Sequence, residues 1–433
     1  MTNICRLLII ACLLPIALVC WCADAPAPFI RYRDQVVFFG DSITAIGVYS
    51  LPMSSFFTLR YPEYHVTTIR NAGVPGNTAQ DGLNRLQSDV IEQHPTVVLT
   101  CFGINEMRAA PRDPKTLETY LATMTTIVQT LKKTPKVRQI LLSPPCVDPN
   151  GKGNAIWYKT SDDAQAANAM VEQMTDGLRA LATREAIPFC DIFHPMLAIQ
   201  TSMKAAEAGW SMLPDGIHPD GFGGVLMAAI ILNFMHCTRP AGSVTIDAVS
   251  NTITADNCTV VDLQVSPRRV SFIRTDTVLP LTVWNAEHGE QERVMLRLHS
   301  LPSYREWNRY PLRVTGLPVG RWQLAAPGNA DLGSYTATQW AAGIDLSPVM
   351  GPWTELGMLM NWMEKTQQER WAFTEGSVRK IERWPLSDVQ RLEAKEFKQQ
   401  LIDLLLQGNA NDRYLLMDVT HRTSTWVLTR VGE

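Results

Sequence analysis

Three residues in two short segments have the types and spacing that nucleophilic catalysis requires. Ser42 lies in Gly-Asp-Ser-Ile-Thr, directly after the apolar run at residues 36–39, and Asp215 and His218 lie three positions apart in Asp-Gly-Ile-His-Pro. A serine hydroxyl is a weak nucleophile until a neighbouring base takes its proton. A carboxylate that accepts a hydrogen bond from one imidazole nitrogen leaves the other nitrogen to face the serine. The pattern therefore predicts Ser42 as nucleophile, His218 as base and Asp215 as the acid that orients it.

Two further segments offer donors for the negative charge that develops on a carbonyl oxygen during acyl transfer. Residues 71–78 read Asn-Ala-Gly-Val-Pro-Gly-Asn-Thr and offer backbone N–H groups, whereas residues 103–106 read Gly-Ile-Asn-Glu and offer the side-chain amide of Asn105. Asn71 is expected to bond its own backbone and hold its loop together.

Apolar runs alternate with helical patterns between residues 36 and 237, which is typical of a parallel sheet covered by helices on both faces. The predicted strands cover residues 36–39, 66–70, 97–102, 139–143 and 188–192. The predicted helices cover residues 45–60, 78–93, 114–133, 162–185 and 220–236. The four polar segments fall at carboxyl ends of these strands or in a loop before a helix, where such sheets bind ligands. We therefore expect them to meet in one crevice.

A second Asp-x-x-His pair, Asp191 and His194, leaves the choice of catalytic pair open on spacing alone. Asp215 and His218 are favoured because they follow the last strand in a polar, glycine-containing loop. Asp191 is instead expected to end a strand and cap its loop. No Gly-x-Ser-x-Gly elbow, P-loop or His-Glu-x-x-His motif occurs, which argues against an α/β-hydrolase fold, a phosphate-binding loop and a zinc site of that type.

The four segments, in this order and spacing, resemble the conserved blocks of the SGNH hydrolase (GDSL esterase and lipase) superfamily over about residues 34–237. The resemblance implies a flavodoxin-like three-layer α/β/α fold, hydrolysis of carboxylic esters, and no metal or cofactor. It also implies that Ser42, Asp215 and His218 are catalytic.

By position, the resemblance implies an oxyanion hole formed by the backbone N–H groups of Ser42 and Gly76 and the amide of Asn105. Two residues depart from the family pattern: Ile43 stands where the first block has Leu, and Glu106 stands where the third block usually has Asp. Neither residue supplies a reacting atom.

The chain is expected to comprise a signal peptide at residues 1–25, the hydrolase domain at 26–238 and a C-terminal α+β accessory domain at 243–433. After the break at 238–243 the pattern is rich in strands, and helices are predicted over 348–372 and 387–408. Nine of the twelve tryptophans lie beyond residue 240. Core packing is expected for most of them, with glycan binding by this domain as the alternative.

The amino end has the features of an export signal. Arg6 precedes an apolar stretch at residues 7–21 that is shorter than a bilayer span, and Ala23 and Ala25 follow as small residues near a cleavage point. A lipid attached at Cys20 or Cys22 and an uncleaved membrane anchor are the alternatives. We predict a secreted or periplasmic protein whose mature chain has no integral membrane span.

Composition limits the classes of partner and cofactor. Of 433 residues, 39 are basic and 42 acidic, so a formal net charge of −3 gives no basic excess for binding nucleic acid. No cysteine spacing resembles a zinc site. Cys237 and Cys258 are a possible disulfide across the domain junction, and the cysteines at strand-like runs, 101, 146 and 190, are expected in the core.

The expected function is that of a secreted serine esterase acting on O-acetyl groups of carbohydrates, because residues 71–78 and 142–149 are more similar to secreted bacterial carbohydrate esterases than to lipases. Alternatives are hydrolysis of lysophospholipids, longer acyl esters or thioesters, and an inactive envelope protein that binds glycan. The loops at 144–162 and 196–214 are expected to determine specificity.

Overall fold

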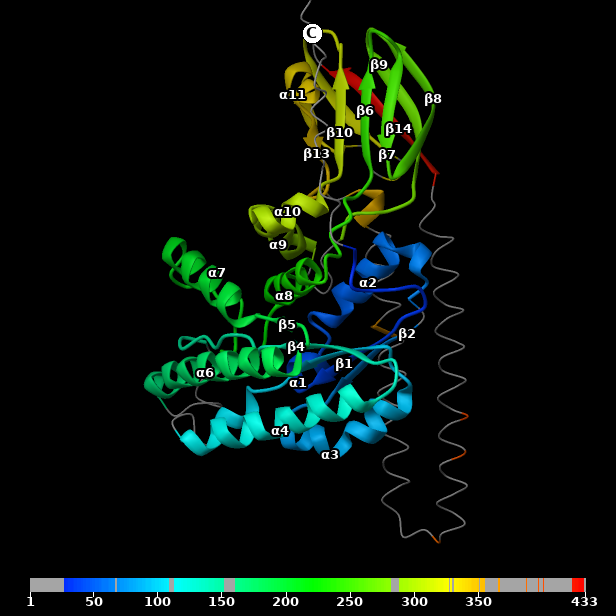
Figure 1. Cartoon of the computed structure of the whole chain (residues 1–433). Helices are drawn as coiled ribbons and strands as arrows, with labels where there is room; N and C mark the ends of the chain where they lie inside the picture. The colour runs from blue at the N-terminus through cyan, green and yellow to red at the C-terminus, as the bar shows by residue number, and fades with distance from the viewer. Residues whose placement is uncertain are drawn as a thin grey trace, which may run out of the picture.

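A computed structural model describes most of the chain between residues 27 and 354, together with its last strand (Figure 1). The described residues are 27–66, 68–108, 113–151, 160–281, 288–326, 328, 331–349, 351–354, 365–366, 387, 396, 400 and 423–431. The predicted signal peptide lies outside them. All but a few residues of the helices predicted over 348–372 and 387–408 also lie outside.

The first unit is built on a five-stranded parallel sheet. Its strands are β1 (Gln35–Gly40), β2 (Thr68–Gly73), β3 (Val97–Cys101), β4 (Arg138–Leu142) and β5 (Phe189–Cys190). They pair in the order β2-β1-β3-β4-β5, which is the flavodoxin-like order. Every residue of β3 is buried, because apolar side chains cover both of its faces. The predicted fold class is confirmed.

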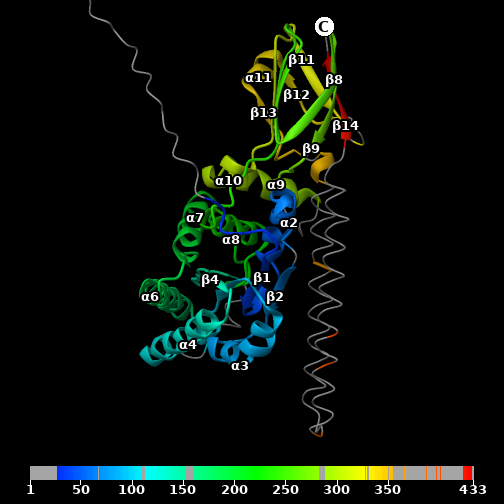
Figure 2. The same cartoon turned by 45° about the vertical axis from the view of Figure 1, so that its right-hand side comes forward.

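Helices cover both faces of this sheet (Figures 1 and 2). One face carries α3 (Ala79–Asp89), α4 (Pro114–Lys133) and α6 (Ser161–Glu185). The other face carries α2 (Ser50–Arg60), α7 (Phe193–Ala206) and α8 (Gly221–Phe234). Side-chain caps explain several starts: Thr78 and Asp81 form a capping box at α3, Asp113 caps α4 and Asp220 caps α8.

Two local expectations were wrong. The helix predicted over 45–60 is interrupted at Gly47, whose positive φ of 77° ends the short helix α1 (Ser42–Ala45) before α2 begins. The loop expected at 196–214 is largely α7. The N-cap residue Ile192 offers no capping side chain. The distant Ser143 Oγ accepts hydrogen bonds from the N–H groups of Ile192 and Phe193 at 2.8 and 2.9 Å, and Asp191 Oδ1 accepts from the His194 N–H at 3.1 Å. The part of this cap that comes from the distant loop after β4 leaves no local signal in the sequence.

The second unit is rich in strands, as expected, and contains two sheets. One has the order β13-β10-β6-β7 and the other the order β12-β11-β14-β9-β8. Their strands are β6 (Ser243–Asp247), β7 (Thr252–Asp256), β8 (Cys258–Ser266), β9 (Arg269–Asp276), β10 (Pro311–Thr315), β11 (Arg321–Ala325), β12 (Ser334–Thr336), β13 (Ile344–Asp345) and β14 (Thr423–Val431). The helix α11 (Ala337–Ala342) precedes β13. Strand β14, from the carboxyl end of the chain, pairs between β11 and β9.

Both sheets of the second unit share one apolar core, which four tryptophans help to fill. Trp322, Trp340, Trp353 and Trp426 are each at most 2% exposed, so core packing is confirmed for these four. The indole faces of Trp353 and Trp426 stack on each other with ring centroids 5.6 Å apart. Buried rings of this kind have no face left for stacking on a sugar. The side chains of five others, 284, 307, 362, 371 and 384, lie outside the described part.

The helices α9 (His288–His299) and α10 (Pro302–Asn308) lie between the two units and pack on α8 (Figure 1). Leu298 and Tyr304 of these helices belong to the apolar core of the α/β unit. The buried guanidinium of Arg60, at the end of α2, donates to Leu279 O, Arg239 O and Asn308 Oδ1 at 2.5, 2.6 and 2.7 Å. The two units are therefore joined by apolar packing and by one buried polar cluster.

Cys237 and Cys258 are buried and free, and each donates to a nearby carbonyl, so the possible disulfide is absent here.

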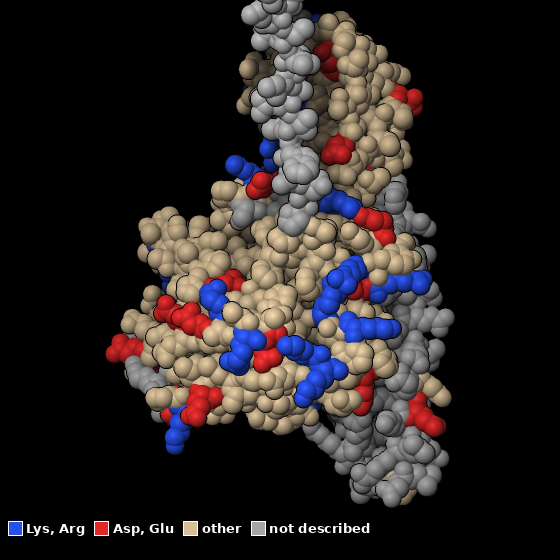
Figure 3. Space-filling view, in the orientation of Figure 1, with Lys and Arg blue, Asp and Glu red and all other residues tan. Residues whose placement is uncertain are grey.

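On the face in Figure 3, basic side chains gather toward the middle of the α/β unit and acidic ones lie around them, so both signs of charge are present. Within the described ranges, no helix has the length and apolar character that a bilayer crossing requires.

Candidate active site

Ser42 is the first residue of α1, at the point where β1 ends. Asp41 caps this short helix, and its Oδ1 accepts a hydrogen bond from the N–H of Ile43 at 3.0 Å. Gly40 is required before them because a Cβ at this position lies 2.2 Å from Thr44 Oγ1 and 2.5 Å from Cys101 O. The close approach of β1 to β3 and to α1 therefore places the Ser42 hydroxyl at the carboxyl edge of the sheet.

The loop before α8 brings an imidazole and a carboxylate to this hydroxyl. His218 Nε2 lies 2.8 Å from Ser42 Oγ, and His218 Nδ1 lies 2.6 Å from Asp215 Oδ2. Asp215 Oδ1 accepts two backbone hydrogen bonds, from Ile217 at 3.0 Å and His218 at 2.7 Å. Partial burial raises the pKa of Asp215, but the hydrogen bonds from the His218 imidazole and the two amides lower it by more, so its pKa lies below the usual value.

The second Asp-x-x-His pair folds into the same local turn elsewhere. Asp191 Oδ1 accepts from the His194 N–H at 3.1 Å, and Asp191 Oδ2 lies 2.8 Å from His194 Nδ1. Its surroundings differ, since Arg179 also donates to Asp191 Oδ2 at 2.6 Å and His194 Nε2 lies 3.9 Å from Glu172. The prediction that Asp191 caps its own loop after a strand is confirmed. Of the two pairs, the structure brings only Asp215 and His218 to Ser42.

The two segments expected to offer oxyanion donors are joined to each other. Asn105, at the start of a 3₁₀ turn after β3, donates from Nδ2 to the carbonyl of Asn77 at 2.9 Å. Gly76 has a φ of 78°, and no heavy atom lies within 4 Å of where its Cβ belongs, so the space beside this residue is open. Asn71 accepts from the Gly73 N–H at 2.9 Å and donates to Thr44 O at 2.5 Å. The prediction that Asn71 stabilises its own loop is confirmed.

Comparison with known proteins identifies the family of the α/β unit. Residues 38–223 match the GDSL-like lipase/acylhydrolase family. An acetylxylan esterase from Geobacillus stearothermophilus is 24% identical over 220 residues, which cover 46% of this chain and 92% of that protein. The α/β unit, which the family match covers, belongs to the SGNH hydrolase superfamily. It is therefore a hydrolase of ester bonds.

Solved structures extend the likeness in fold. A gut microbial diltiazem-metabolizing enzyme superposes with a TM-score of 0.72 at 20% identity, over 94% of this chain and 99% of its own. That protein therefore shares the fold of both units of this SGNH hydrolase. The crystal structure of an acetylxylan esterase from Geobacillus stearothermophilus, 24% identical, covers 48% of this chain and 95% of its own with a TM-score of 0.38.

Arg85 on α3 connects the segments of the SGNH site, and sequence reasoning missed it. Its guanidinium donates to Gly40 O at 2.8 Å, Ala72 O at 2.8 Å and Asn77 Oδ1 at 2.7 Å, and it lies over the Phe39 ring. One side chain thus joins the loop that carries Ser42 to the loop that carries Gly76. Two of its acceptors are backbone carbonyls, which have no side-chain signature in the sequence.

Two buried carboxyl groups lie behind the site. Burial, together with the nearby Glu106 carboxyl, raises the pKa of Asp41 to about 7, although the hydrogen bond from the Ile43 N–H lowers it. Burial also raises the pKa of Glu106 to about 7, although Glu106 Oε1 accepts from the Ala79 N–H at 2.5 Å. Glu106, which departs from the family pattern, therefore joins the third block to the start of α3. Among the described residues, no three His, Cys, Asp or Glu side chains are grouped as metal ligands.

Proposed function

We propose that the protein is a serine esterase in which Ser42 attacks the ester carbonyl. The observation that carries the proposal is the 2.8 Å contact between His218 Nε2 and Ser42 Oγ. His218 takes the serine proton as the hydroxyl attacks, and then gives it to the leaving alcohol. The Asp215 carboxylate accepts from His218 Nδ1 and stabilises the imidazolium that forms. An acyl-enzyme results, and water activated by His218 releases the acid.

We place the tetrahedral oxyanion among three donors: the backbone N–H groups of Ser42 and Gly76 and the side-chain amide of Asn105. The bond from Asn105 to Asn77 O supports this assignment, because it uses one amide hydrogen and fixes the amide plane beside the loop of Gly76. The open space beside Gly76 leaves room for the acyl group. Preorganised donors of this kind act on charge that develops only during the reaction.

The proposed substrates are O-acetyl groups on carbohydrates. The name of the acetylxylan esterase relative favours this class. A pocket of about 310 Å³ lies between the start of α3 and α4, and Glu106, the residue after Asn105, is on its wall. The lining includes Thr78, Gln80, Glu106, Lys115, Thr116, Thr119 and Thr123. Side chains of this type suit the hydroxyl groups of a sugar. Lysophospholipids, thioesters and longer acyl esters are the second candidate class.

We also propose that residues 1–25 direct export and are removed, that residues 26–238 form the catalytic domain, and that residues 243–433 form an accessory domain. Packing of α9 and α10 on α8 supports a structural role of the accessory domain, because these helices cover part of the catalytic unit. Mass spectrometry of the protein secreted by an expression host locates the new amino terminus. Retention of the intact leader contradicts the export proposal.

The mechanism is tested with p-nitrophenyl acetate and the Ser42→Ala variant. We expect turnover by the wild type and its loss in the variant, together with labelling of wild-type Ser42 by a fluorophosphonate. Equal rates for the two proteins contradict the mechanism. Substrate class is tested with a series of acyl chain lengths and with release of acetate from acetylated polysaccharides. Preference for chains of about eight carbons over acetyl contradicts the carbohydrate assignment.

A further inference from the structure

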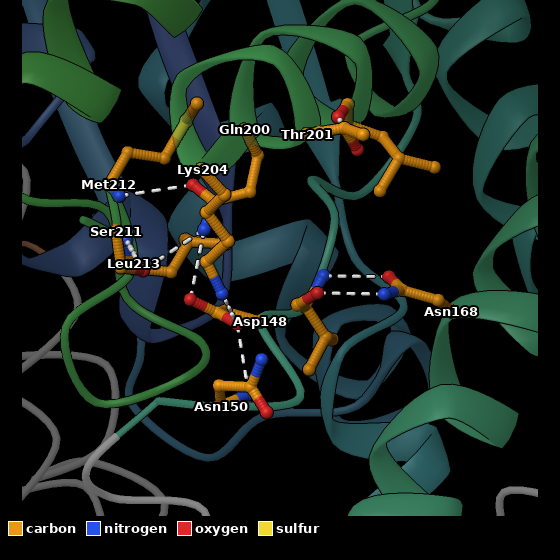
Figure 4. A network of polar contacts seen from close by, with 11 residues as sticks. Asp148, Asn150, Asn168, Gln200, Thr201, Lys204, Ser211, Met212 and Leu213 are labelled. Atoms are coloured by element: carbon orange, nitrogen blue, oxygen red, sulfur yellow. Dashed lines mark hydrogen bonds and ion pairs between the residues drawn. The ribbon is translucent and has the colours of Figure 1, made fainter. Parts of the chain in front are cut away.

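A buried polar cluster next to the loop of His218 is not part of the reacting groups (Figure 4). Its centre is Asp148, in the loop that follows β4. Asp148 is only 1% exposed. The Asp148 carboxylate forms an ion pair with Lys204 of α7 and accepts from Gln200 Nε2 at 2.9 Å. It also accepts from the N–H of Asn150 in its own loop at 2.9 Å. A buried carboxylate is costly unless it has such partners, so Asp148 and α7 are tied to one another.

The backbone of the same residue contacts the segment that carries the catalytic pair. The Asp148 N–H donates to the carbonyl of Gly216 at 2.9 Å, and Gly216 lies between Asp215 and His218. Gly151 closes the contact, because a Cβ at this position lies only 2.2 Å from Gly216 N. The loop after β4 therefore lies directly against the peptide that follows Asp215.

Gln200 contacts the other end of the same segment. Its Oε1 accepts from the Met212 N–H at 3.1 Å, and its Nε2 lies 3.2 Å from Ser211 Oγ, which in turn accepts from Leu213 N at 2.9 Å. Figure 4 shows Gln200 and Lys204 extending from one face of α7 toward Asp148 and the Ser211 turn. The segment 211–216 is thus held at Met212 through Gln200 and at Gly216 through Asp148.

We propose that Asp148 is a positioning residue for the Asp215 and His218 pair, acting through the segment 211–216. The inference rests on the proposed catalytic role of His218. Asp148 reaches this segment through the Gly216 carbonyl, so its effect is on where the imidazole stands. Misplacement of a catalytic group by about 1 Å costs on the order of a hundredfold in rate. Turnover is therefore more sensitive to this cluster than substrate binding is.

The experiment compares kcat and KM of Asp148→Ala, Asp148→Asn and Gly151→Ala with the wild type. Rates are divided by the concentration of sites labelled by a fluorophosphonate, so that unfolded protein does not count. We expect kcat of Asp148→Ala to fall by about ten- to a hundredfold, with KM within twofold. Asp148→Asn keeps one acceptor oxygen and should recover part of the loss. Gly151→Ala perturbs the same peptide without changing a charge and should also lower kcat.

A second readout does not depend on turnover. Low-field proton NMR follows the hydrogen on His218 Nδ1 that is bonded to Asp215, identified by its loss in His218→Ala. We expect Asp148→Ala and Gly151→Ala to shift or broaden this resonance. Asp191→Asn is the matched control, because it disturbs the same type of turn around His194 and should change neither readout.

The outcomes separate the two proposals. Loss of activity in Ser42→Ala with unchanged kcat and an unchanged resonance in Asp148→Ala and Gly151→Ala overturns the positioning role alone. An inactive wild type contradicts the esterase mechanism, while the resonance still tests whether Asp148 positions His218. A fall in kcat that Asp191→Asn reproduces indicates a general loss of stability and also overturns the proposal.

Discussion

His218 Nε2 lies 2.8 Å from Ser42 Oγ, although the two residues are 176 positions apart in the chain. The close packing of α8 against the segment after α1 explains how they meet. Gly224 of α8 lies so near this segment that a Cβ there is 2.3 Å from Val48 O. This close packing brings the start of α8, and with it the preceding loop that carries His218, to the end of β1.

Replacing His218 and His194 one at a time is expected to show which of the two similar turns takes part in catalysis. His218→Ala should lower kcat by roughly four to six orders of magnitude, because the base that activates Ser42 is lost. His194→Ala is the control and should keep kcat within twofold, since His194 contacts Asp191 and Glu172 instead. Steady-state kinetics with p-nitrophenyl acetate measure both. A large loss in His194→Ala contradicts the assignment of the pair.

Asn105→Ala is expected to lower kcat by about a hundred- to a thousandfold, the usual cost of one oxyanion donor. KM should change much less, because the charge it stabilises is absent from the bound ester. Asn84→Ala removes an exposed amide on α3 that contacts Gln80 and serves as the control. Should both variants turn over at the wild-type rate, Asn105 has no role in the oxyanion hole.

Glu106→Gln is expected to stabilise the protein above neutral pH. In the folded chain the pKa of Glu106 is raised to about 7 by burial, from an ordinary value of 4.5. Below pH 4.5 the folded and unfolded states both hold the proton, so burial of Glu106 does not lower the free energy of unfolding of the wild type through ionisation. Between pH 4.5 and 7 the unfolded chain ionises Glu106 while the folded chain keeps the proton. Over this range the wild type loses up to about 3 kcal/mol of its free energy of unfolding relative to the variant, at about 1.4 kcal/mol per pKa unit, and the loss levels off above pH 7.

Urea unfolding of wild type and Glu106→Gln between pH 4 and pH 8.5 measures this difference. The glutamine oxygen can still accept from the Ala79 N–H, so the start of α3 keeps its contact. Glu118→Gln changes an exposed carboxylate on α4 and should show no such pH dependence. A difference between wild type and Glu106→Gln that does not grow with pH contradicts the prediction.

Arg60→Met is expected to lower the free energy of unfolding by about 3 kcal/mol or more, because two buried acceptors and one partly buried acceptor lose their donor. Arg60→Lys should recover only part of the loss, since an ammonium group does not span all three acceptors. Arg297→Ala breaks an exposed ion pair with Glu207 between α9 and α7, and should cost less than about 1 kcal/mol. Denaturant unfolding of all three variants measures their free energies of unfolding and so ranks the three losses. Equal losses from Arg60→Met and Arg297→Ala contradict the importance of the buried cluster.

Strong local patterns allowed most of the α/β unit to be predicted. The helix expected over 114–133 has the same bounds in the structure, because an Asp-Pro start and an amphipathic pattern are both encoded locally. Helix α7 was missed in part because its N-cap residue Ile192 has no capping side chain and the N–H groups of Ile192 and Phe193 are bonded by Ser143 from another part of the chain. Arg85 and Asp148 were missed for a similar reason, since their contacts with the site include backbone groups of distant segments.

By itself, the sequence determined which chemistry is present and the local form of each turn. Asp-x-x-His produces the same carboxylate-imidazole hydrogen bond at residues 191–194 and 215–218, because the bond closes within four residues. Only the tertiary structure decided which imidazole reaches Ser42. The distance between residues so far apart depends on the strand order and on how α8 packs, which no short stretch of sequence encodes.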